Sequence, residues 1–436
     1  NTEHYILCMT TGNPKEPKIH SAIERHYYLT PDQPSGIECI ALKEGFGYWE
    51  RHGDQINDLI QYLAQVNGRI ATDIQSYLSD IYSGDPSDGE EDPYGDDAHY
   101  AEREAETYEH HESWSQLCNG VKYKARFFNQ AIEDILNDLF CDLELLKTND
   151  GKPILRKVGF DTDLTHIYRA RFSQSDKEIE KILTNPVEEL GAPPSIYAKH
   201  GRMNSVGISV FYGASDIDTC IAEVRPPVGS DVVIGRFQFV KELTLLDFNR
   251  LTQCYAEGSF FDPNFKTRLD RAKFLEFLAH ELSSPIMPGA EVFEYLPTQV
   301  IAEYLSEKLK LNGMIFNSSQ SDGQNIVLFR NCFKVKPYDL PKGAKVIVSQ
   351  EFYAEDDYDD SITVHEEVSI FNNTEKDTEF FNAEHFLDED YLDGVNISLV
   401  IDVKNDIYVR TIRKIQYSSK ERSVFRYRSE KKTYSF

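Results

Sequence analysis

Apolar residues recur at steps of three and four positions, or sums of these, from Ile56 to Ile81. This spacing predicts an amphipathic helix, and Ser83-Gly84 marks its end. A second pattern of this kind runs from Phe127 to Leu143. Because each segment has one apolar stripe, we expect the two helices to pack against each other in a mainly helical domain over residues 1–150. The turn Thr148-Asn149-Asp150-Gly151 closes that domain.

Beyond residue 160 the pattern becomes mixed. Runs rich in β-branched and aromatic residues predict strands at 206–212, 232–239, 326–329, 344–348, 395–403 and 407–415. Helical stretches lie around 267–281 and 298–310, and Asn405-Asp406 predicts a hairpin between the last two strands. The sequence therefore indicates an α+β fold, with one domain over 160–337 and a β-rich extension over 338–436.

The segment 85–112 separates the two helical patterns. Acidic residues dominate it, Pro and Gly punctuate its first half, and Arg103 is its only strong base. We interpret it as a solvated loop; an acidic segment that binds a partner is the alternative. His110-His111-Glu112 lies within it. A flexible carboxylate-rich loop binds divalent ions only weakly and without function, so we expect no metal.

Composition restricts the partners. The chain of 436 residues carries a formal net charge of −27. An acidic protein repels phosphate backbones, so we expect no nucleic-acid partner, while a local basic pocket for a small anion stays compatible. The seven cysteines form no CxxC pair, which favours free thiols and a cytoplasmic location. No stretch approaches the roughly 18 apolar residues of a membrane helix, so we expect no membrane association.

Candidate chemical groups concentrate between residues 166 and 225. Arg202 lies between Gly201 and Asn204, where the chain must turn, and Glu223 follows the apolar run Cys220-Ile221-Ala222. That run would hold the carboxylate near the protein interior, where an arginine is its natural partner. Taken alone, such a pair is more often a structural salt bridge, and Tyr212 in an apolar strand is more often a core aromatic residue.

These residue types suit cleavage of a dinucleotide. An arginine fork binds pyrophosphate through paired hydrogen bonds, and a tyrosine ring offers a flat face to nicotinamide or adenine. A carboxylate can hold ribose hydroxyls and stabilise an oxocarbenium-like state at C1′ of the ribose. Because nicotinamide leaves as a neutral molecule, no general acid is needed. One negative group and a clamp on the phosphates could suffice.

Several short motifs occur in one order along the chain. They are YRAR (168–171), GRMN (201–204), VFYGAS (210–215), CIAEV (220–224), YLPTQ (295–299) with IAE (301–303), GMIFNSS (313–319) and GQNIVLF (323–329). This ordered set resembles the RES domain family over about residues 165–335. The resemblance implies a fold similar to ADP-ribosyltransferases. It also implies a bacterial toxin that degrades NAD⁺ by hydrolysis or phosphorolysis. NAD⁺ would be a substrate, with inorganic phosphate as co-substrate in phosphorolysis, and no redox cofactor would be bound.

The resemblance also implies catalytic roles. Arg202 would bind the dinucleotide phosphates, Tyr212 would face the nicotinamide, and Glu223 would act on the ribose. Ser318 would be the serine of the family, with Ser319 as the alternative register.

Further residues would bind the substrate. Arg169 would contact the phosphates, Tyr168 would shape the pocket, and Asn204 would support the loop that carries Arg202. Met203 and Phe316-Asn317 depart from the common family pattern. These departures affect the pocket walls and the details of the substrate rather than the class of reaction.

The segment Val121–Phe128 resembles, more loosely, the HEPN-like helical domain that precedes RES in longer family members. HEPN domains can be ribonucleases through an Arg and a His a few residues apart. Arg103 and His110 lie in the acidic segment, so we favour a scaffold for dimerisation or for sensing a trigger. We therefore expect a homo-oligomer and a regulatory partner such as an antitoxin. Two alternatives remain: an ADP-ribosyltransferase that modifies a macromolecule, and a non-catalytic sensor or interaction protein.

Overall fold

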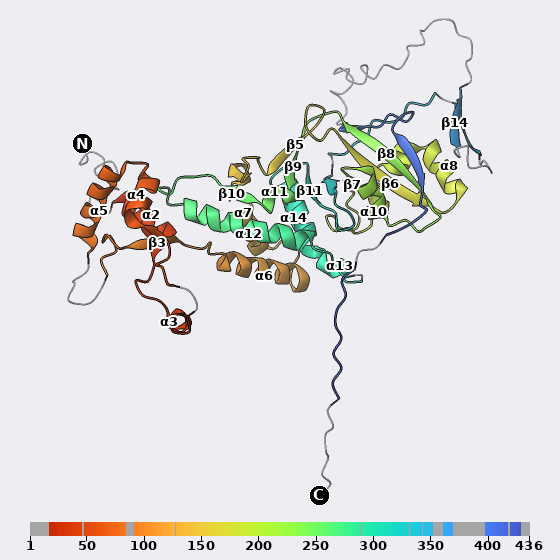
Figure 1. Ribbon diagram of the computed structural model, residues 1–436. Helices are drawn as coiled ribbons and strands as arrows, with labels where there is room; N and C mark the ends of the chain where they lie inside the picture. Colours follow the sequence, from red (N-terminus) through yellow and green to blue (C-terminus); the bar gives the residue numbers. More distant parts are fainter. Residues whose placement is uncertain are drawn as a thin grey trace.

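The computed structural model describes residues 17–45, 48–83, 91–126, 128–287, 289–330, 332–341, 343–351, 361–368, 397–416 and 419–428. Figure 1 shows an elongated molecule with a small N-terminal lobe at one end, long helices in the middle and a large sheet at the other end. Helices and strands are mixed, as the sequence predicts. Within the described part of the chain, no helix is long and apolar enough to cross a membrane.

The N-terminal lobe is built from short elements around its own core. These are α2 (Lys18–His26), β1 (Tyr27–Leu29), α3 (Gly36–Lys43), β2 (Asp54–Gln55), α4 (Ile56–Ala64), α5 (Gly68–Tyr82) and β3 (His99–Glu102). The single helix predicted from Ile56 to Ile81 is two helices. Gln65 adopts a left-handed conformation (φ 52°) that ends α4, and the Asn67 side chain accepts the Ile70 N–H to start α5.

The second half of the predicted acidic loop is structured. Residues 99–102 form β3, and α6 (Tyr108–Tyr123) contains His110, His111 and Glu112. Residues 85–90 lie outside the described residues. The loop prediction is therefore wrong for 99–102 and 108–112, whereas residues 91–98 and 103–107 form neither helix nor strand. The acidic residues of α6 lie on its exposed side, while Leu117 and Val121 are buried.

The predicted contact between the two helical patterns is also wrong. The second pattern forms α7 (Gln130–Leu139), which shares a core with α6, α12 (Phe265–Ser283) and α14 (Leu296–Glu307). The helices α4 and α5 pack on α2 in a separate core. The long α12 and α14 confirm the helices predicted around 267–281 and 298–310. Their buried faces offer α7 a larger apolar surface than the N-terminal lobe does.

A nine-stranded sheet has the order β15-β8-β6-β7-β12-β11-β9-β5, with β16 also paired to β8. Its strands are β5 (Leu155–Val158), β6 (His166–Ser173), β7 (Phe211–Ala214), β8 (Asp231–Phe239), β9 (Leu243–Asp247), β11 (Gly313–Asn317), β12 (Gln324–Leu328), β15 (Leu399–Val400) and β16 (Ile407–Thr411). Of these pairs, only β11 and β9 are parallel. Three apolar clusters pack on the sheet.

Shorter elements complete the fold. The small pair β4 (Leu146–Thr148) and β10 (Cys254–Ala256) links the helical region to the sheet, and β13 (Lys345–Glu351) pairs with β14 (Ser361–Glu367). The remaining helices are α8 (Asp176–Thr184), α9 (Pro186–Leu190), α10 (Ile217–Val224), α11 (Phe248–Leu251) and α13 (Glu291–Glu294). The strand predicted at 206–212 begins only at Phe211, because Gly207 (φ 82°) lies in a turn.

The hairpin predicted at Asn405-Asp406 does not form. Both β15 and β16 run antiparallel to β8, end to end along the same strand. Val400 faces Gln238 and Ile407 faces Gly235, so seven residues of one segment span three residues of β8. A turn closed by the Asp406 N–H on the Asp402 carbonyl (2.8 Å) takes up the surplus. The nine-residue β8 is long enough to pair with both segments, which makes a separate hairpin unnecessary.

Candidate functional site

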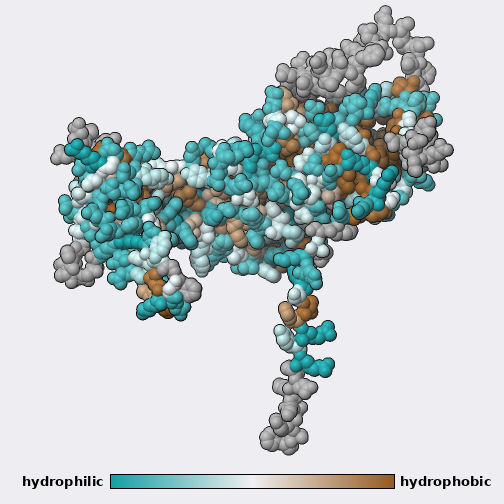
Figure 2. Space-filling model, in the orientation of Figure 1, coloured by the Kyte–Doolittle hydropathy of each residue, from teal (hydrophilic) through white to brown (hydrophobic). Residues whose placement is uncertain are grey.

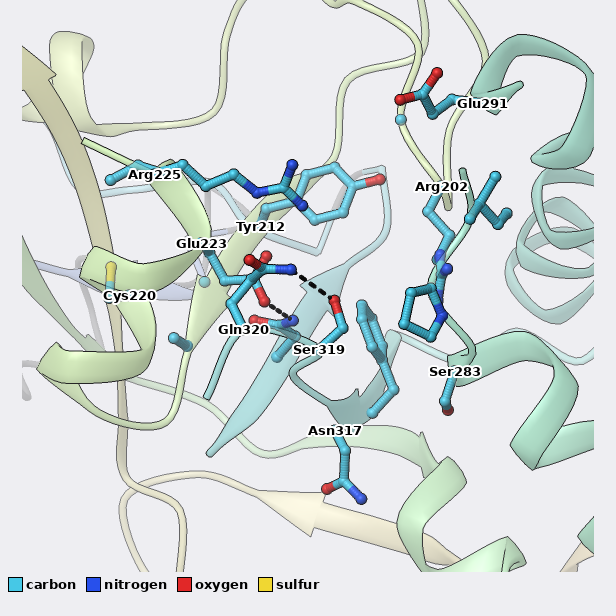
Figure 3. Close-up of a pocket in the computed structure, with 18 of the residues that line it drawn as sticks. Arg202, Tyr212, Cys220, Glu223, Arg225, Ser283, Glu291, Asn317, Ser319 and Gln320 are labelled. Carbon is cyan, nitrogen blue, oxygen red and sulfur yellow. Dashed lines mark hydrogen bonds between the residues drawn. The ribbon is translucent and has the colours of Figure 1, made fainter. Parts of the chain in front are cut away.

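A cavity of about 470 Å³ opens where β6, β7 and β12 meet α10 and the C-terminal end of α12. Side chains distant in sequence meet in its wall, as Figure 3 shows. Among the residues singled out from the sequence, Arg169, Arg202, Tyr212, Glu223 and Ser319 line it. The structure therefore brings both arginines and the carboxylate to one place.

The loop that carries Arg202 is a tight turn in which the backbones of Gly201 and Asn204 pair (N···O 2.9 Å). The hydroxyl of Tyr212 donates to Oδ1 of Asn204 (2.9 Å) and accepts the N–H of Met203 (3.0 Å). A Cβ at Gly201 would lie only 2.5 Å from Oδ1 of Asn204 and 2.6 Å from the Tyr212 hydroxyl. Only glycine fits there.

Asn204 and Tyr212 thus brace the loop. The Nδ2 of Asn204 donates to the carbonyls of Lys199, Ser205 and Ile208. Tyr212 is half-buried in the cavity wall, and burial raises its pKa to about 12. Its hydroxyl is occupied within the loop, so only the ring is free to meet a ligand.

Helix α14 fixes the same loop from behind. The Thr298 hydroxyl donates to the Arg202 carbonyl, and Nε2 of Gln299 donates to the carbonyls of Gly201 (2.8 Å) and Asn204 (3.0 Å). Thr298 and Gln299 are both buried. The backbone under Arg202 is therefore held at several points, and the Arg202 side chain projects from a rigid base.

The Arg202 guanidinium lies at the C-terminal end of α12. Its Nη1 donates to the Leu282 carbonyl (2.6 Å) and its Nη2 to the Ser284 carbonyl, where unsatisfied helix carbonyls attract a cation. Its centre lies 5.7 Å from the Tyr295 ring. Five N–H donors are available to an arginine, so several remain for a ligand in the cavity.

Arg169 is half-buried at the other side of the cavity. Its Nη1 donates to the Tyr212 carbonyl (2.7 Å), the guanidinium lies 5.0 Å from the Phe211 ring, and the buried Nε has no hydrogen-bond partner. Burial, with Arg171 nearby, lowers the pKa of Arg169 to about 10, so it stays charged at neutral pH. Within the described residues it forms no ion pair. An anion in the cavity would relieve this uncompensated charge.

Glu223 lies on the last turn of α10, at the cavity. Its Oε1 accepts the Ser318 hydroxyl (2.5 Å) and Nδ2 of Asn325 (2.7 Å). The side chain is exposed and forms no ion pair among the described residues. The expectation of a buried acid paired with an arginine is therefore wrong. The helix ends at Val224, which leaves Glu223 facing the opening while two neutral donors hold its carboxylate.

The two candidate serines have different surroundings. Ser318 follows β11, accepts the Gln320 N–H (3.0 Å) and reaches Glu223. Ser319 accepts Nε2 of Gln320 (3.0 Å) and lines the cavity (Figure 3). Only Ser318 contacts the carboxylate.

Residues 166–344 match the family model of the RES domain. The match covers the segment whose motifs carry the resemblance and begins after residue 150, so the HEPN-like assignment stays a prediction. One solved structure is also similar: the crystal structure of the M. tuberculosis MbcT–MbcA toxin–antitoxin complex. The two chains share 13% sequence identity over 38% of this chain and 73% of that one, with a TM-score of 0.21. No curated protein matches the chain.

Two residues at this cavity were not singled out from the sequence. Asn325 is 8% exposed and holds Glu223. In the sequence, its polar side chain within the mostly apolar run Gly323–Phe329 could have marked it as a site residue. Arg225 caps α10 in a left-handed conformation (φ 48°) and lines the cavity. Its sequence context gave no signal, because an arginine after an apolar helix is common on protein surfaces.

Tyr168 stands apart from the residues that line the cavity. Its ring meets His166 edge to face at 5.2 Å and packs beside α10. Burial is the main reason that its pKa is raised. The structure therefore gives it a packing position behind the cavity wall.

The charge of the cavity lining is opposite to that of the whole chain. Arg169, Arg202 and Arg225 line it beside the carboxylates of Glu223 and Glu291, while the chain carries −27. Among the described residues there is no group of three or more His, Cys, Asp or Glu side chains that could hold a metal. A small anionic ligand suits this cavity better than a cation does.

Proposed function

We propose that the RES domain cleaves the bond between nicotinamide and ribose in NAD⁺, with water or phosphate as the nucleophile. The observation that carries the proposal is the position of Glu223. Two neutral donors, Ser318 and Asn325, hold its carboxylate at a cavity that also contains three arginines. Within the described residues these arginines form no ion pair. A fixed negative group beside them suits a ligand with a pyrophosphate and a developing positive charge on its sugar.

The arginines would position the substrate. Arg169 has a free buried Nε, and Arg202 retains donors beyond its two carbonyl contacts. Charge-assisted hydrogen bonds from both would hold the two phosphates. The braced loop keeps Arg202 in place, so its clamp requires little reorganisation when the substrate binds.

Glu223 would act on the ribose. In the reaction the bond from C1 of the ribose to the nicotinamide nitrogen breaks, and its electron pair neutralises the pyridinium ring. The carboxylate stabilises the resulting oxocarbenium-like sugar. Water then adds its oxygen to C1 and releases a proton, giving ADP-ribose. If phosphate adds instead, the product is ADP-ribose 1″-phosphate. Ser318 and Asn325 keep the carboxylate oriented through both steps.

The resemblance extends the proposal to a biological role. An enzyme that consumes NAD⁺ drains a cofactor on which growth depends, so the protein would act as a bacterial toxin or defence effector. Such an activity requires restraint. A regulatory partner, such as an antitoxin that covers the cavity, is the corresponding expectation.

The test is to incubate the full chain with NAD⁺, with and without phosphate, and to identify the products by chromatography and mass spectrometry. Glu223→Gln should abolish nicotinamide release. Glu303→Gln is the matched control, since Glu303 is an exposed carboxylate of the same domain that does not line the cavity. The proposal fails if the wild-type chain releases no nicotinamide, or if Glu223→Gln is as active as Glu303→Gln.

One observation favours a second enzymatic function. Glu223 is exposed, so a large acceptor could approach the reacting carbon and receive ADP-ribose. Incubation with NAD⁺ labelled in its adenine, together with a bacterial lysate, separates the two activities. Label on protein or nucleic acid would indicate transfer, whereas free ADP-ribose or its phosphate would indicate cleavage.

A further inference from the structure

The last part of the sequence differs in charge from the rest of the chain. Residues 413–436 contain eight lysines and arginines and two glutamates, a net charge of +6. The whole chain carries −27, so the preceding 412 residues carry −33. We call residues 413–428 the basic arm. The proposed NAD⁺ chemistry gives this segment no role.

The basic arm leaves the body directly after the sheet. Its anchor is Ile412, whose carbonyl accepts the Gly229 N–H (2.8 Å) and whose N–H donates to Ser230 (2.9 Å). Beyond it, every described residue of the arm is exposed, and none forms a hydrogen bond or ion pair with the body. Figure 1 shows its later described part, residues 419–428, extending away from the molecule. The described run 419–428, ten residues long, spans about 33 Å when extended, enough to reach across part of a neighbouring molecule.

The arm carries apolar as well as basic side chains. Val424, Phe425 and Tyr427 are 87%, 76% and 88% exposed, and Figure 2 shows hydrophobic residues on the arm far from the body. In an extended chain successive side chains point to opposite sides. Lys420, Arg422, Arg426 and Arg428 therefore share one side, and Phe425 and Tyr427 the other. Bare aromatic residues beside a row of bases are typical of a segment that binds a surface.

From this arrangement we infer that the basic arm docks on the acidic surface of a second copy of this chain. The body carries −33, which attracts the arm of another copy and repels polyanions such as RNA or an anionic membrane. Each copy has one arm and one acidic surface. In a closed dimer the arm of each copy can therefore bind the acidic surface of the other.

The acidic segment 91–112 is the target that fits best. It contains nine acidic residues against one strong base, Arg103. Glu102, Glu104 and Glu109 are exposed, and Tyr108 beside them is 78% exposed. The exposed carboxylates complement the basic side of the arm.

The test is the mass of the full chain in solution, measured by sedimentation velocity over a range of concentrations. In about 0.1 M NaCl we expect twice the chain mass of 50.1 kDa, and in about 1 M NaCl a single chain, because salt screens exposed charges. R422E/R426E/R428E should weaken dimerisation at least about tenfold. R422K/R426K/R428K keeps the charge and should remain dimeric.

A charge swap locates the docking surface. Adding E102K/E104K/E109K to the R422E/R426E/R428E variant, whose arm charge is reversed, should restore the dimer. NAD⁺ consumption should be equal in all variants, because no described residue of the arm lines the cavity. The inference is overturned if the wild type is monomeric at low salt, or if arm reversal leaves the dimer intact. It is also overturned if a monomeric chain binds single-stranded RNA or anionic vesicles through the arm, or if the charge swap does not restore the dimer.

Discussion

Replacing Tyr212 by phenylalanine removes one oxygen atom from the brace under Arg202. That oxygen accepts the Met203 N–H (3.0 Å) and donates to Oδ1 of Asn204 (2.9 Å). Phenylalanine keeps the ring, so any contact of the ring with a ligand is preserved. The Met203 N–H would then lack its partner in a part-buried place. A buried donor left unsatisfied costs about 1–3 kcal/mol of folding free energy.

The loss should appear in two measurements. Urea unfolding can be followed by the fluorescence of Trp114, which packs on the core that contains Met203; Trp49, the second of the two tryptophans, is replaced by phenylalanine in both proteins. The unfolding free energy of Tyr212→Phe should fall by about 1–3 kcal/mol. The loosened loop should reduce kcat/KM for NAD⁺ by roughly ten- to a hundredfold.

The opposite result is equally informative. If the stability of Tyr212→Phe stays within about 0.5 kcal/mol of wild type, the hydroxyl is not a brace of the loop. If stability falls while kcat/KM is unchanged, the loop is braced but the position of Arg202 does not limit the reaction.

Further substitutions test the other contacts. Gly201→Ala should destabilise the protein by about 1–3 kcal/mol and weaken NAD⁺ binding, because its Cβ would meet Asn204 and Tyr212. Thermal unfolding measures the stability and KM the binding. An unchanged melting temperature would contradict the close packing around Gly201. Asn325→Ala should lower kcat about ten- to a hundredfold at unchanged stability in urea, whereas full activity would remove Asn325 from the site. Burial raises the pKa of Cys118 to about 11 and of Cys220 and Cys254 to about 12. Their thiols ionise first in the unfolded chain, so stability should fall as pH rises above about 9; a urea midpoint at pH 10 equal to that at pH 8 would contradict this burial.

The candidate site residues could be chosen from the sequence, whereas the packing around them could not. By type alone these residues were ordinary, and the order of the motifs that resemble the RES domain family selected Arg202, Glu223 and Ser318. The exposure of Glu223 could not be foreseen, because the end of α10 at Val224 decides it. Asn325 was hidden for a related reason: its partner lies 102 residues away, and no local pattern encodes that contact.

Amino-acid composition averaged over a long segment gave a wrong prediction of its secondary structure. The acids between residues 85 and 112 indicated a loop, yet Leu117 and Val121 continue a helix that begins at Tyr108 and buries one side. The choice of partner for α7 was equally invisible, since an apolar stripe specifies that a helix is buried and not what buries it. The Asn405-Asp406 turn was placed correctly, but pairing of both flanking segments with β8 depends on the length of that strand.

The shared core of α6, α7, α12 and α14 has a consequence for how the protein is made. The RES-type segment begins at residue 166, yet Leu117, Val121 and Leu136 fill the core beneath the helix whose end holds Arg202. A fragment starting at residue 166 would leave that apolar surface bare and should aggregate rather than fold. During synthesis, α6 and α7 leave the ribosome long before α14 is complete. The cavity therefore cannot mature in a partly made chain, and its chemistry would begin only when nearly the whole protein is present.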